Sequence, residues 1–560
     1  MRTENELQVI PLGGLGEFGM NMMALRRRDE IILIDCGKMF PDDTHLGVDS
    51  IIPDMSYVEK NGDKILGLFL THGHEDHIGA VPYLRRLVDV PVYGTPLTLG
   101  LTRMRLREHG LAEETQLREV SDGDSVAASS FGVEFIGISH GIPDSCALAI
   151  STPAGLVIHT GDFKLDQTPL DGRTGYYQKL ARHGEAGVLL LLSDSTNVER
   201  PGYTYSEREV YDGFRRIFED AAGKILVASF ASHLHRMQQV IDLAAEFGRR
   251  VAFCGRSMEQ NSRLARELGY LEIPDGTLAS AKEIAKLPSH EVVVIASGSQ
   301  AEPNSALTRI ALNRHPSVKL APGDVVALSA RKIPGNEKSI SSLVNHLYRR
   351  GAEVVHDGIL DIHVSGHACA EELKMMLNLV RPRYFVPIHG EYRMLHLHAR
   401  LAAATCVEEE NILIAESGDV IAVGDDGIAL AGEVEAGHVL IDSDGAGEVG
   451  ETVVRDRRLL GVEGVVVPIV AVTGEGGGGG SGRPRAAAVQ FVSKGLRLGE
   501  DGAALFGEAE LMLAELVRES SAEEAADEEL MKAKIGKALR RFLRKRLGRR
   551  PMILPVIMEI

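Results

Sequence analysis

The stretch Gly67–His77, GLFLTHGHEDH, decides the expected fold, because a short apolar strand in it runs into a loop with three histidines and an aspartate. Such a loop can present His72 and His74 to one side, while Asp76 and His77 lie about one metal–metal spacing away. The donors are nitrogen and oxygen atoms without a thiolate, which suits Zn²⁺ or Mn²⁺. The stretch therefore predicts two divalent metal ions per subunit, with Zn²⁺ preferred and Mn²⁺ as the second choice.

Three further residues of ligand type follow apolar runs elsewhere in the chain. His140 comes after VEFIGIS, Asp162 lies in HTGD and His389 lies in VPIHG. Each would be an ordinary loop residue on its own, but open sheets place their ligand sites at strand ends. We therefore expect all three to join the histidine-rich loop, with the Asp162 carboxylate able to bridge two metal ions.

The pattern of strands and helices divides the chain. Short strands dominate at first, and strands alternate with helices from Ser206, which is typical of a parallel, doubly wound unit. Histidine-rich loops return near Ile359, and a Gly- and Asp-rich stretch follows. The expected organisation is a metal-binding domain in two parts, 1–205 and 359–440, an inserted domain at 206–358, a linker at 441–456 and a C-terminal domain at 457–560, in which GEGGGGGSG (474–482) marks a mobile loop.

Global composition gives weaker constraints. The net charge of −18 by itself disfavours a polyanionic substrate. Two divalent cations held by Asp76, Asp162 and a hydroxide would still leave a net positive centre for one phosphodiester. Five scattered cysteines without a CxxC pair favour a reducing compartment. Neither an apolar stretch of about 20 residues nor a secretory signal is visible, so we expect a cytoplasmic protein without membrane contact.

A glycine motif near the N-terminus needs a separate interpretation. Gly14–Gly19 matches GxGxxG, the pattern of a dinucleotide-binding turn. The following residues, NMMALRRRDEIILIDCG, have the pattern of two strands joined by a charged turn, so no helix N-terminus is available for a pyrophosphate. We interpret these glycines as a tight connection between strands.

The motifs taken together resemble a known family. The pattern His72-x-His74-x-Asp76-His77, followed by His140 and Asp162, resembles the metallo-β-lactamase superfamily, with Asp35 in IDCG matching its structural aspartate. Asp194 in SDSTN, His367 in SGHA and His389 in PIHGEYRM resemble the three added motifs of the β-CASP nucleases. With GRSM, GSQ and IPGNEK, the set is similar to the bacterial ribonuclease J family over essentially all 560 residues.

The resemblance implies both a fold and an activity. The fold would be a metallo-β-lactamase αββα sandwich with an inserted doubly wound α/β β-CASP domain and a small α+β C-terminal domain. The activity would be hydrolysis of single-stranded RNA to 5′-phosphate and 3′-hydroxyl products, by a 5′-to-3′ exonuclease acting from 5′-monophosphate ends and by an endonuclease, in RNA maturation and mRNA decay. His389 favours RNA, since DNA-cleaving relatives carry an aliphatic residue there.

The resemblance also implies two ligand sets joined by one carboxylate: His72, His74 and His140 for one ion, Asp76, His77 and His389 for the other, and Asp162 bridging them.

Roles for the remaining site residues follow from their chemistry. We expect Asp76, Asp194 and His367 to be catalytic. His367 would contact the scissile phosphate and assist the leaving oxygen, and Asp194 would orient a ligand histidine or the nucleophile. Turns that suit phosphates, together with the loop that holds His367, predict a pocket for a terminal monophosphate. The expected substrate-binding residues are Ser232, His233, Arg256, Ser257, Ser365, Gly366 and His367.

The terminal segment carries an expectation about assembly. It ends in the basic stretch KAKIGKALRRFLRKRLGRR (532–550) and the apolar tail PMILPVIMEI. Leu539, Phe542, Leu543 and Leu547 give the basic stretch an apolar stripe, so it could pack on its own domain, on a partner subunit, or bind RNA. We expect self-association into at least a homodimer, and partners in an RNA-decay complex.

Three other function classes stay open at this point. A thioester or lactam hydrolase would use the same metal site but has no reason to keep a large α/β insert with added motifs. A di-iron oxidoreductase would want a flavin or rubredoxin module, and neither signature occurs. A non-catalytic RNA scaffold would be expected to have lost ligands. Assays with labelled RNA, a lactam and a thioester separate these classes.

Overall fold

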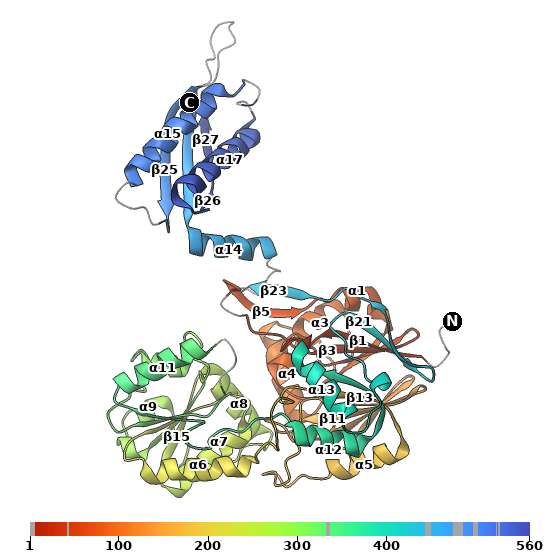
Figure 1. The fold of residues 1–560 in the computed structure, drawn as a ribbon. Coiled ribbons are helices and arrows are strands. Elements are labelled where there is room, and N and C mark those ends of the chain that lie inside the picture. Colours follow the sequence, from red (N-terminus) through yellow and green to blue (C-terminus); the bar gives the residue numbers. More distant parts are fainter. Residues whose placement is uncertain are drawn as a thin grey trace. The chain divides into compact units, whose positions relative to one another are not determined.

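The computed structural model describes residues 6–41, 44–331, 336–442, 450–473, 485–496, 502–521, 524 and 527–559. The chain divides into two compact units, one formed by residues 1–40 and 50–439 and the other by residues 41–49 and 440–560 (Figure 1). The expected mobile loop at 474–482 lies outside the described residues, as do the first three residues of IPGNEK, 333–335. Within the described residues, no helix is long and apolar enough to cross a membrane.

Two sheets face each other in the first unit. One has the strand order β22 (Gly427–Glu433), β21 (Asp419–Gly424), β1 (Leu7–Gly13), β3 (Met22–Arg27), β4 (Glu30–Ile34), β6 (Ile65–Phe69), β7 (Val92–Gly94) and β8 (Leu117–Glu119). The other has the order β19 (Pro382–Ile388), β13 (Val188–Asp194), β12 (Gly155–His159), β11 (Cys146–Thr152), β10 (Phe131–Gly137) and β9 (Ser125–Ala128). Alternate apolar side chains of both sheets, such as Val9, Ile32, Phe135 and Leu148, share one buried core.

Helices cover the outer faces of both sheets. A second core joins the six-stranded sheet to α5 (Tyr176–Ala186), α12 (Ala370–Val380) and α13 (Tyr392–Ala403). On the other sheet, α4 (Pro96–Glu108) packs on β7 and β8 and contacts α3 (Val81–Leu87), which in turn contacts α1 (Ser56–Asn61). The result is the expected αββα sandwich.

The ends of four strands define one edge of the six-stranded sheet. β12, β13 and β19 are parallel neighbours, and Asp194 at the end of β13 is in register with Ile388 at the end of β19. β10 and β12 both pair antiparallel with β11, so they run in the same direction. All four strands therefore deliver the residues that follow them to the same edge.

The inserted residues form a parallel, doubly wound sheet, as the alternation of strands and helices predicts. Its strand order is β15 (Arg250–Cys254), β16 (Val292–Ala296), β14 (Ile225–Ala228), β17 (Val325–Leu328) and β18 (Glu353–His356), and Figure 1 shows helices on both faces. Alternate strand residues pack on α9 (Ala281–Ile284), α10 (Ala306–Ala311) and α11 (Glu337–Arg349). The remaining helices are α6 (Glu207–Asp220), α7 (Leu234–Glu246) and α8 (Arg256–Glu267).

The glycine motif connects strands, as expected. Gly14, Gly16 and Gly19 have φ values of 85°, 84° and 92°, which only glycine adopts readily. β2 (Leu15–Gly16) lies within the motif and pairs with β20 (Gly390–Glu391), directly after His389. The glycines therefore let the chain turn beside the site instead of opening a nucleotide-binding helix.

The second unit is a small α+β domain. β24 (Val465–Thr473) pairs antiparallel with β25 (Arg485–Lys494) and parallel with β26 (Met552–Ile553) and β27 (Val556–Glu559). Helices α15 (Gly502–Glu519) and α17 (Glu528–Leu547) bury apolar residues against this sheet. β5 (Val48–Pro53) and β23 (His438–Asp442) form a separate two-stranded sheet.

One detail of this unit differs from the expectation. The expected linker at 441–456 contains the start of α14 (Glu451–Glu463), because Thr452–Leu460 has ordinary helix-forming residues after the glycines. The apolar tail PMILPVIMEI contains β26 and β27, which pair with β24. The apolar stripe of α17 packs on its own domain, with Leu539 and Leu543 buried.

Candidate metal centre

Asp35 holds the histidine-rich loop in place at the end of β4. It adopts a left-handed backbone conformation, with φ of 56°. Its carboxylate accepts hydrogen bonds from the backbone N–H and the hydroxyl group of Thr71, each at 2.8 Å, and lies 2.7 Å from Nδ1 of His77. Because a carboxylate accepts, it keeps the hydrogen of His77 on Nδ1. The Nε2 atom then carries the lone pair, and it lies 3.1 Å from Nδ2 of Asn21.

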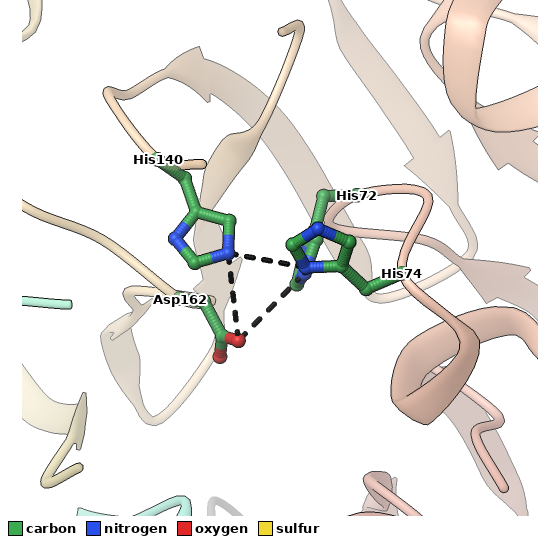
Figure 2. A group of neighbouring side chains, drawn as sticks. All are labelled: His72, His74, His140 and Asp162. Carbon is green, nitrogen blue, oxygen red and sulfur yellow. Dashed lines mark hydrogen bonds and ion pairs between the residues drawn. The ribbon is translucent and has the colours of Figure 1, made fainter. Parts of the chain in front are cut away.

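One group of ligand atoms comes from His72, His74, His140 and Asp162, and these atoms all lie within 4.8 Å of one another. Nδ1 of His74 lies 3.0 Å from Nε2 of His72 and 3.2 Å from Nε2 of His140. Oδ2 of Asp162 lies 3.7 Å from Nε2 of His72 and 3.9 Å from Nε2 of His140. Figure 2 shows the histidine rings and the carboxylate turned toward a common centre.

Neighbouring groups decide which ring nitrogens are free. Nδ1 of His140 lies 2.8 Å from the carbonyl oxygen of Gly366, which only accepts, so the hydrogen is on Nδ1. The Thr71 hydroxyl donates to Asp35 and therefore accepts from Nδ1 of His72, 3.0 Å away. The Nε2 atoms of both rings are thus left with lone pairs that meet beside a carboxylate.

Converging lone pairs need a positive charge between them. Burial lowers the pKa of His74 to about 4 and the pKa of His140 to about 3, so protonation does not supply this charge at neutral pH. A divalent cation with nitrogen and oxygen ligands fits the group.

A second group consists of Asp76, His77, Asp162 and His389, again within 4.8 Å. The Asp162 carboxylate places Oδ2 3.3 Å from Nε2 of His77 and Oδ1 3.3 Å from Nε2 of His389. Oδ2 of Asp76 lies 3.6 Å from the same two nitrogen atoms. Asp162 therefore belongs to both groups, as a bridging carboxylate would.

The state of His389 also fits a metal ligand. Its Nδ1 lies 2.8 Å from Oγ1 of Thr196, which donates to Asp194, so the hydrogen of His389 is on Nδ1. Its Nε2 is buried and has no hydrogen-bond partner among the described residues. Although burial disfavours the charged form, Asp162 and Asp194 raise the pKa of His389 well above its usual value. The carboxylates thus attract positive charge to this position, as a proton or as a metal ion.

Asp194 links His367 to the metal centre. Its side chain is 1% exposed, and Oδ2 lies 2.7 Å from Nδ1 of His367. Oδ1 accepts from the backbone N–H of Thr196 at 2.9 Å and from its hydroxyl at 2.7 Å, and lies 3.4 Å from Nδ1 of His389. Although burial disfavours the charged form, Asp194 raises the pKa of His367 above its usual value. The His367 side chain is 22% exposed, so a substrate can reach it.

Gly366 brings the His367 loop into contact with the first ligand group. A Cβ atom at this position would lie 2.7 Å from Cε1 of His140 and 2.8 Å from the backbone nitrogen of Gly141. A side chain would therefore collide with the candidate ligand His140, which explains why glycine stands here. A phosphate bound by this loop would lie next to the metal centre.

The other expected substrate-binding residues belong to the inserted domain, and among them His233 contacts the turn after His140. His233 is buried, and its Nδ1 lies 3.1 Å from the carbonyl oxygen of Gly141, so it packs against the turn after His140. Ser232 and Ser257 are half-buried, and Arg256, the first residue of α8, is exposed. Among the described residues, Arg256 has no hydrogen bond or ion pair in this structure, so its guanidinium is available to a ligand.

Several residues that contact the candidate site were not predicted from the sequence. Thr71 and Thr196 fix the hydrogen positions of His72 and His389, two of the candidate ligands. Asn21 donates from Nδ2 to the carbonyl oxygen of Asp76 at 3.0 Å, and Asn197 contacts the His367 loop. Asn197 lies within SDSTN, so the only signal in the sequence is that it follows Asp194 by three positions. The sequence around Asn21 contains no signal for its contact.

Comparisons with family models cover most of the chain. Residues 15–200 match the metallo-beta-lactamase superfamily, and residues 351–414 match the Zn-dependent metallo-hydrolase RNA specificity domain. Residues 222–347 match the ribonuclease J beta-CASP domain, and residues 452–560 match the ribonuclease J C-terminal domain. Metal binding and the expected fold class agree with these matches.

Individual proteins give the same result. The chain is 40% identical over 554 residues to ribonuclease J 1 of Streptococcus pyogenes, which covers 99% of this chain and 98% of the relative. It is 42% identical to ribonuclease J of Thermus thermophilus, with coverage of 99% and 96%. A solved structure of a protein of unknown function from Enterococcus faecalis has a TM-score of 0.52 at 15% identity, covers 75% of this chain and all of that one, and shows the fold alone.

Proposed function

This chain belongs to the ribonuclease J family, and from that premise we propose that it is a metal-dependent ribonuclease that hydrolyses single-stranded RNA in RNA maturation and mRNA decay. The observation that carries the proposal is that the two groups described above share Asp162, which also lies in a third group of ligand-type atoms with Asp194, His367 and His389. We assign two divalent ions, Zn²⁺ as first choice and Mn²⁺ as second, to the following ligands: His72, His74 and His140 for one ion, Asp76, His77 and His389 for the other, and Asp162 for both.

The proposed reaction breaks the bond between phosphorus and the 3′-oxygen after a water oxygen attacks phosphorus. Bound at this centre, two divalent ions would supply positive charge for the phosphate and lower the pKa of the attacking water. His367, held by Asp194, donates a proton to the leaving 3′-oxygen. The products carry 5′-phosphate and 3′-hydroxyl ends.

A thioester or lactam hydrolase is not favoured as the alternative. The chain matches family models for a β-CASP domain and for an RNA specificity domain, which a small-molecule hydrolase would not need. We propose the domain boundaries stated above, with one change, namely that the C-terminal domain starts with α14 at Glu451.

The pocket proposed for a terminal phosphate predicts discrimination between RNA 5′ ends. The 5′-to-3′ exonuclease rate should be about 10- to 100-fold higher on a 5′-monophosphate than on a 5′-triphosphate, because the larger group loses one or two hydrogen bonds. Arg256→Ala should erode this preference and spare internal cleavage, since the exposed guanidinium is available to the terminal phosphate. Time courses on RNAs that differ only at the labelled 5′ end measure both effects.

The matched control is Arg263→Ala, which removes an exposed arginine from the same helix. It should keep the preference for the monophosphate. Equal exonuclease rates on hydroxyl, monophosphate and triphosphate ends would contradict the pocket, because the enzyme would then not read the 5′ end.

One face of the C-terminal sheet supports the proposal of self-association. Val492, Val556 and Met558 are 52%, 40% and 47% exposed. The register places Val467 opposite Val492 and Ile469 opposite Val556, so these side chains share one face. Helices α15 and α17 cover the other face. An uncovered apolar sheet face is typical of a surface that binds a second copy.

We therefore predict that replacing both Val492 and Met558 by lysine lowers the oligomer mass without changing the metal content. Light scattering and metal analysis measure the two properties. Leu511→Lys, at a residue 73% exposed on α15, is the control and should leave the mass unchanged. Deletion of residues 450–560 should also lower the number of subunits in the assembly to one. An unchanged oligomeric state in the double variant would contradict this surface.

A further inference from the structure

The side-chain amide of Asn197 joins parts of the site that are far apart in the sequence. Asn197 follows Asp194 by three residues and is 5% exposed. Its Nδ2 donates to Oγ of Ser365 at 2.8 Å and to the carbonyl oxygen of His367 at 3.0 Å. Its Oδ1 accepts from Nη1 of Arg331 at 3.4 Å. These partners fix the orientation of the amide, because a carbonyl only accepts and a guanidinium only donates.

The same contacts determine the role of the Ser365 hydroxyl. Its oxygen accepts from Nδ2 of Asn197 and from the backbone N–H of His367, the latter at 3.2 Å. A hydroxyl oxygen has two lone pairs, and both are used. No acceptor for its hydrogen occurs among the residues that the structure describes. The Ser365 hydroxyl is therefore left as a donor for an acceptor from outside the chain, such as a phosphate oxygen.

Arg331 is held beside this donor. It follows β17 of the inserted sheet, and its backbone carbonyl accepts from Nε2 of the buried Gln300 at 2.7 Å. Its side chain is exposed, so the N–H groups that do not face Asn197 are open to solvent. A guanidinium presents five N–H donors in a fork that matches the geometry of a phosphate.

The backbone around Asn197 is fixed independently of its amide. Asn197 forms a β-bridge with Cys369, and its carbonyl oxygen accepts from the backbone N–H of Arg200 at 2.9 Å. A change confined to the amide group should therefore leave the course of the chain intact.

We propose that Asn197 is a positioning residue that fixes the Ser365 hydroxyl and the Arg331 guanidinium as a pair of donors for one phosphate of the substrate. This inference rests on the proposed ribonuclease function and adds Asn197 and Arg331 to its site. The phosphate would lie beside His367, since Ser365 is bound to the backbone of that residue.

Asn197→Asp tests the proposal in the full chain, because it keeps the size of the side chain and the acceptor for Arg331 but removes both donors to the His367 loop. The probe is a 5′-phosphorylated, 2′-O-methylated RNA, whose binding is measured without cleavage. The Kd should rise about 10- to 100-fold, and KM for cleavable RNA should rise with it, while the metal content stays at the wild-type value. Asn378→Asp, at an exposed asparagine of α12, is the control and should bind as the wild type does.

A double-mutant cycle separates positioning from general damage. If Asn197 acts through the Ser365 hydroxyl, Asn197→Asp should cost little more in a Ser365→Ala background. Equal affinities of the wild type and Asn197→Asp would overturn the inference, and so would fully additive losses in the cycle. Absence of RNA cleavage by the wild type would instead overturn the proposed function, and the binding measurement would still test the role of Asn197.

Discussion

Replacing His74 by alanine should remove most of the bound metal and lower RNA cleavage by at least about a thousandfold, which corresponds to ~4 kcal/mol of barrier. Nδ1 of His74 lies within 3.2 Å of both other histidines in its group, so its loss opens one side of that group. His74 is only half-buried, so a smaller side chain there should not unfold the sandwich. Metal analysis of the purified protein, with close to two divalent ions expected in the wild type, and cleavage of labelled RNA test the prediction.

The control for this variant is His290→Ala, which removes a histidine whose side chain is 66% exposed in the inserted domain. It should keep both the metal and the activity. Full RNA cleavage by His74→Ala, or by wild-type protein freed of metal and kept in strong chelator, would show that the assigned centre does not carry the reaction.

The sequence was sufficient to predict the fold class and the convergence of the ligand-type residues. Apolar runs that end in His140, Asp162 and His389 indicated strand ends, and the parallel strands β12, β13 and β19 bring such ends to one edge. The motif GxGxxG was correctly interpreted as a strand connection, since no helix-forming run follows it.

The hydrogen-bond partners of these residues could not be predicted. Asn197 contacts Arg331, which lies 134 residues further along the sequence, and Ser365, which lies 168 residues further along. Such contacts depend on side-chain geometry that neither periodicity nor spacing encodes. The start of α14 inside the expected linker was missed for a different reason, because the glycines before Glu451 dominated the local composition.

Asp194→Asn should lower kcat by about a hundredfold to ten-thousandfold while the protein keeps its metal. The carboxylate accepts from Nδ1 of His367 at 2.7 Å and favours the protonated ring, which can give a proton to the leaving 3′-oxygen. An amide nitrogen in place of Oδ2 would donate to Nδ1 and disfavour the charged ring. The metal should stay, because Oδ1 can still accept from Thr196, which fixes His389. Metal analysis and single-turnover cleavage measure the two quantities separately.

A double-mutant cycle decides whether Asp194 acts through His367. His367→Ala alone should cause a loss of similar size, and Asp194→Asn should add little to it, since both variants remove the same proton donor. Asp275→Asn, at an exposed aspartate of the inserted domain, controls for the change in charge and should retain full activity. Loss of metal in Asp194→Asn would instead assign this residue to the support of His389. Additive losses in the cycle would mean that Asp194 and His367 serve separate steps, and another group would then have to protonate the leaving oxygen.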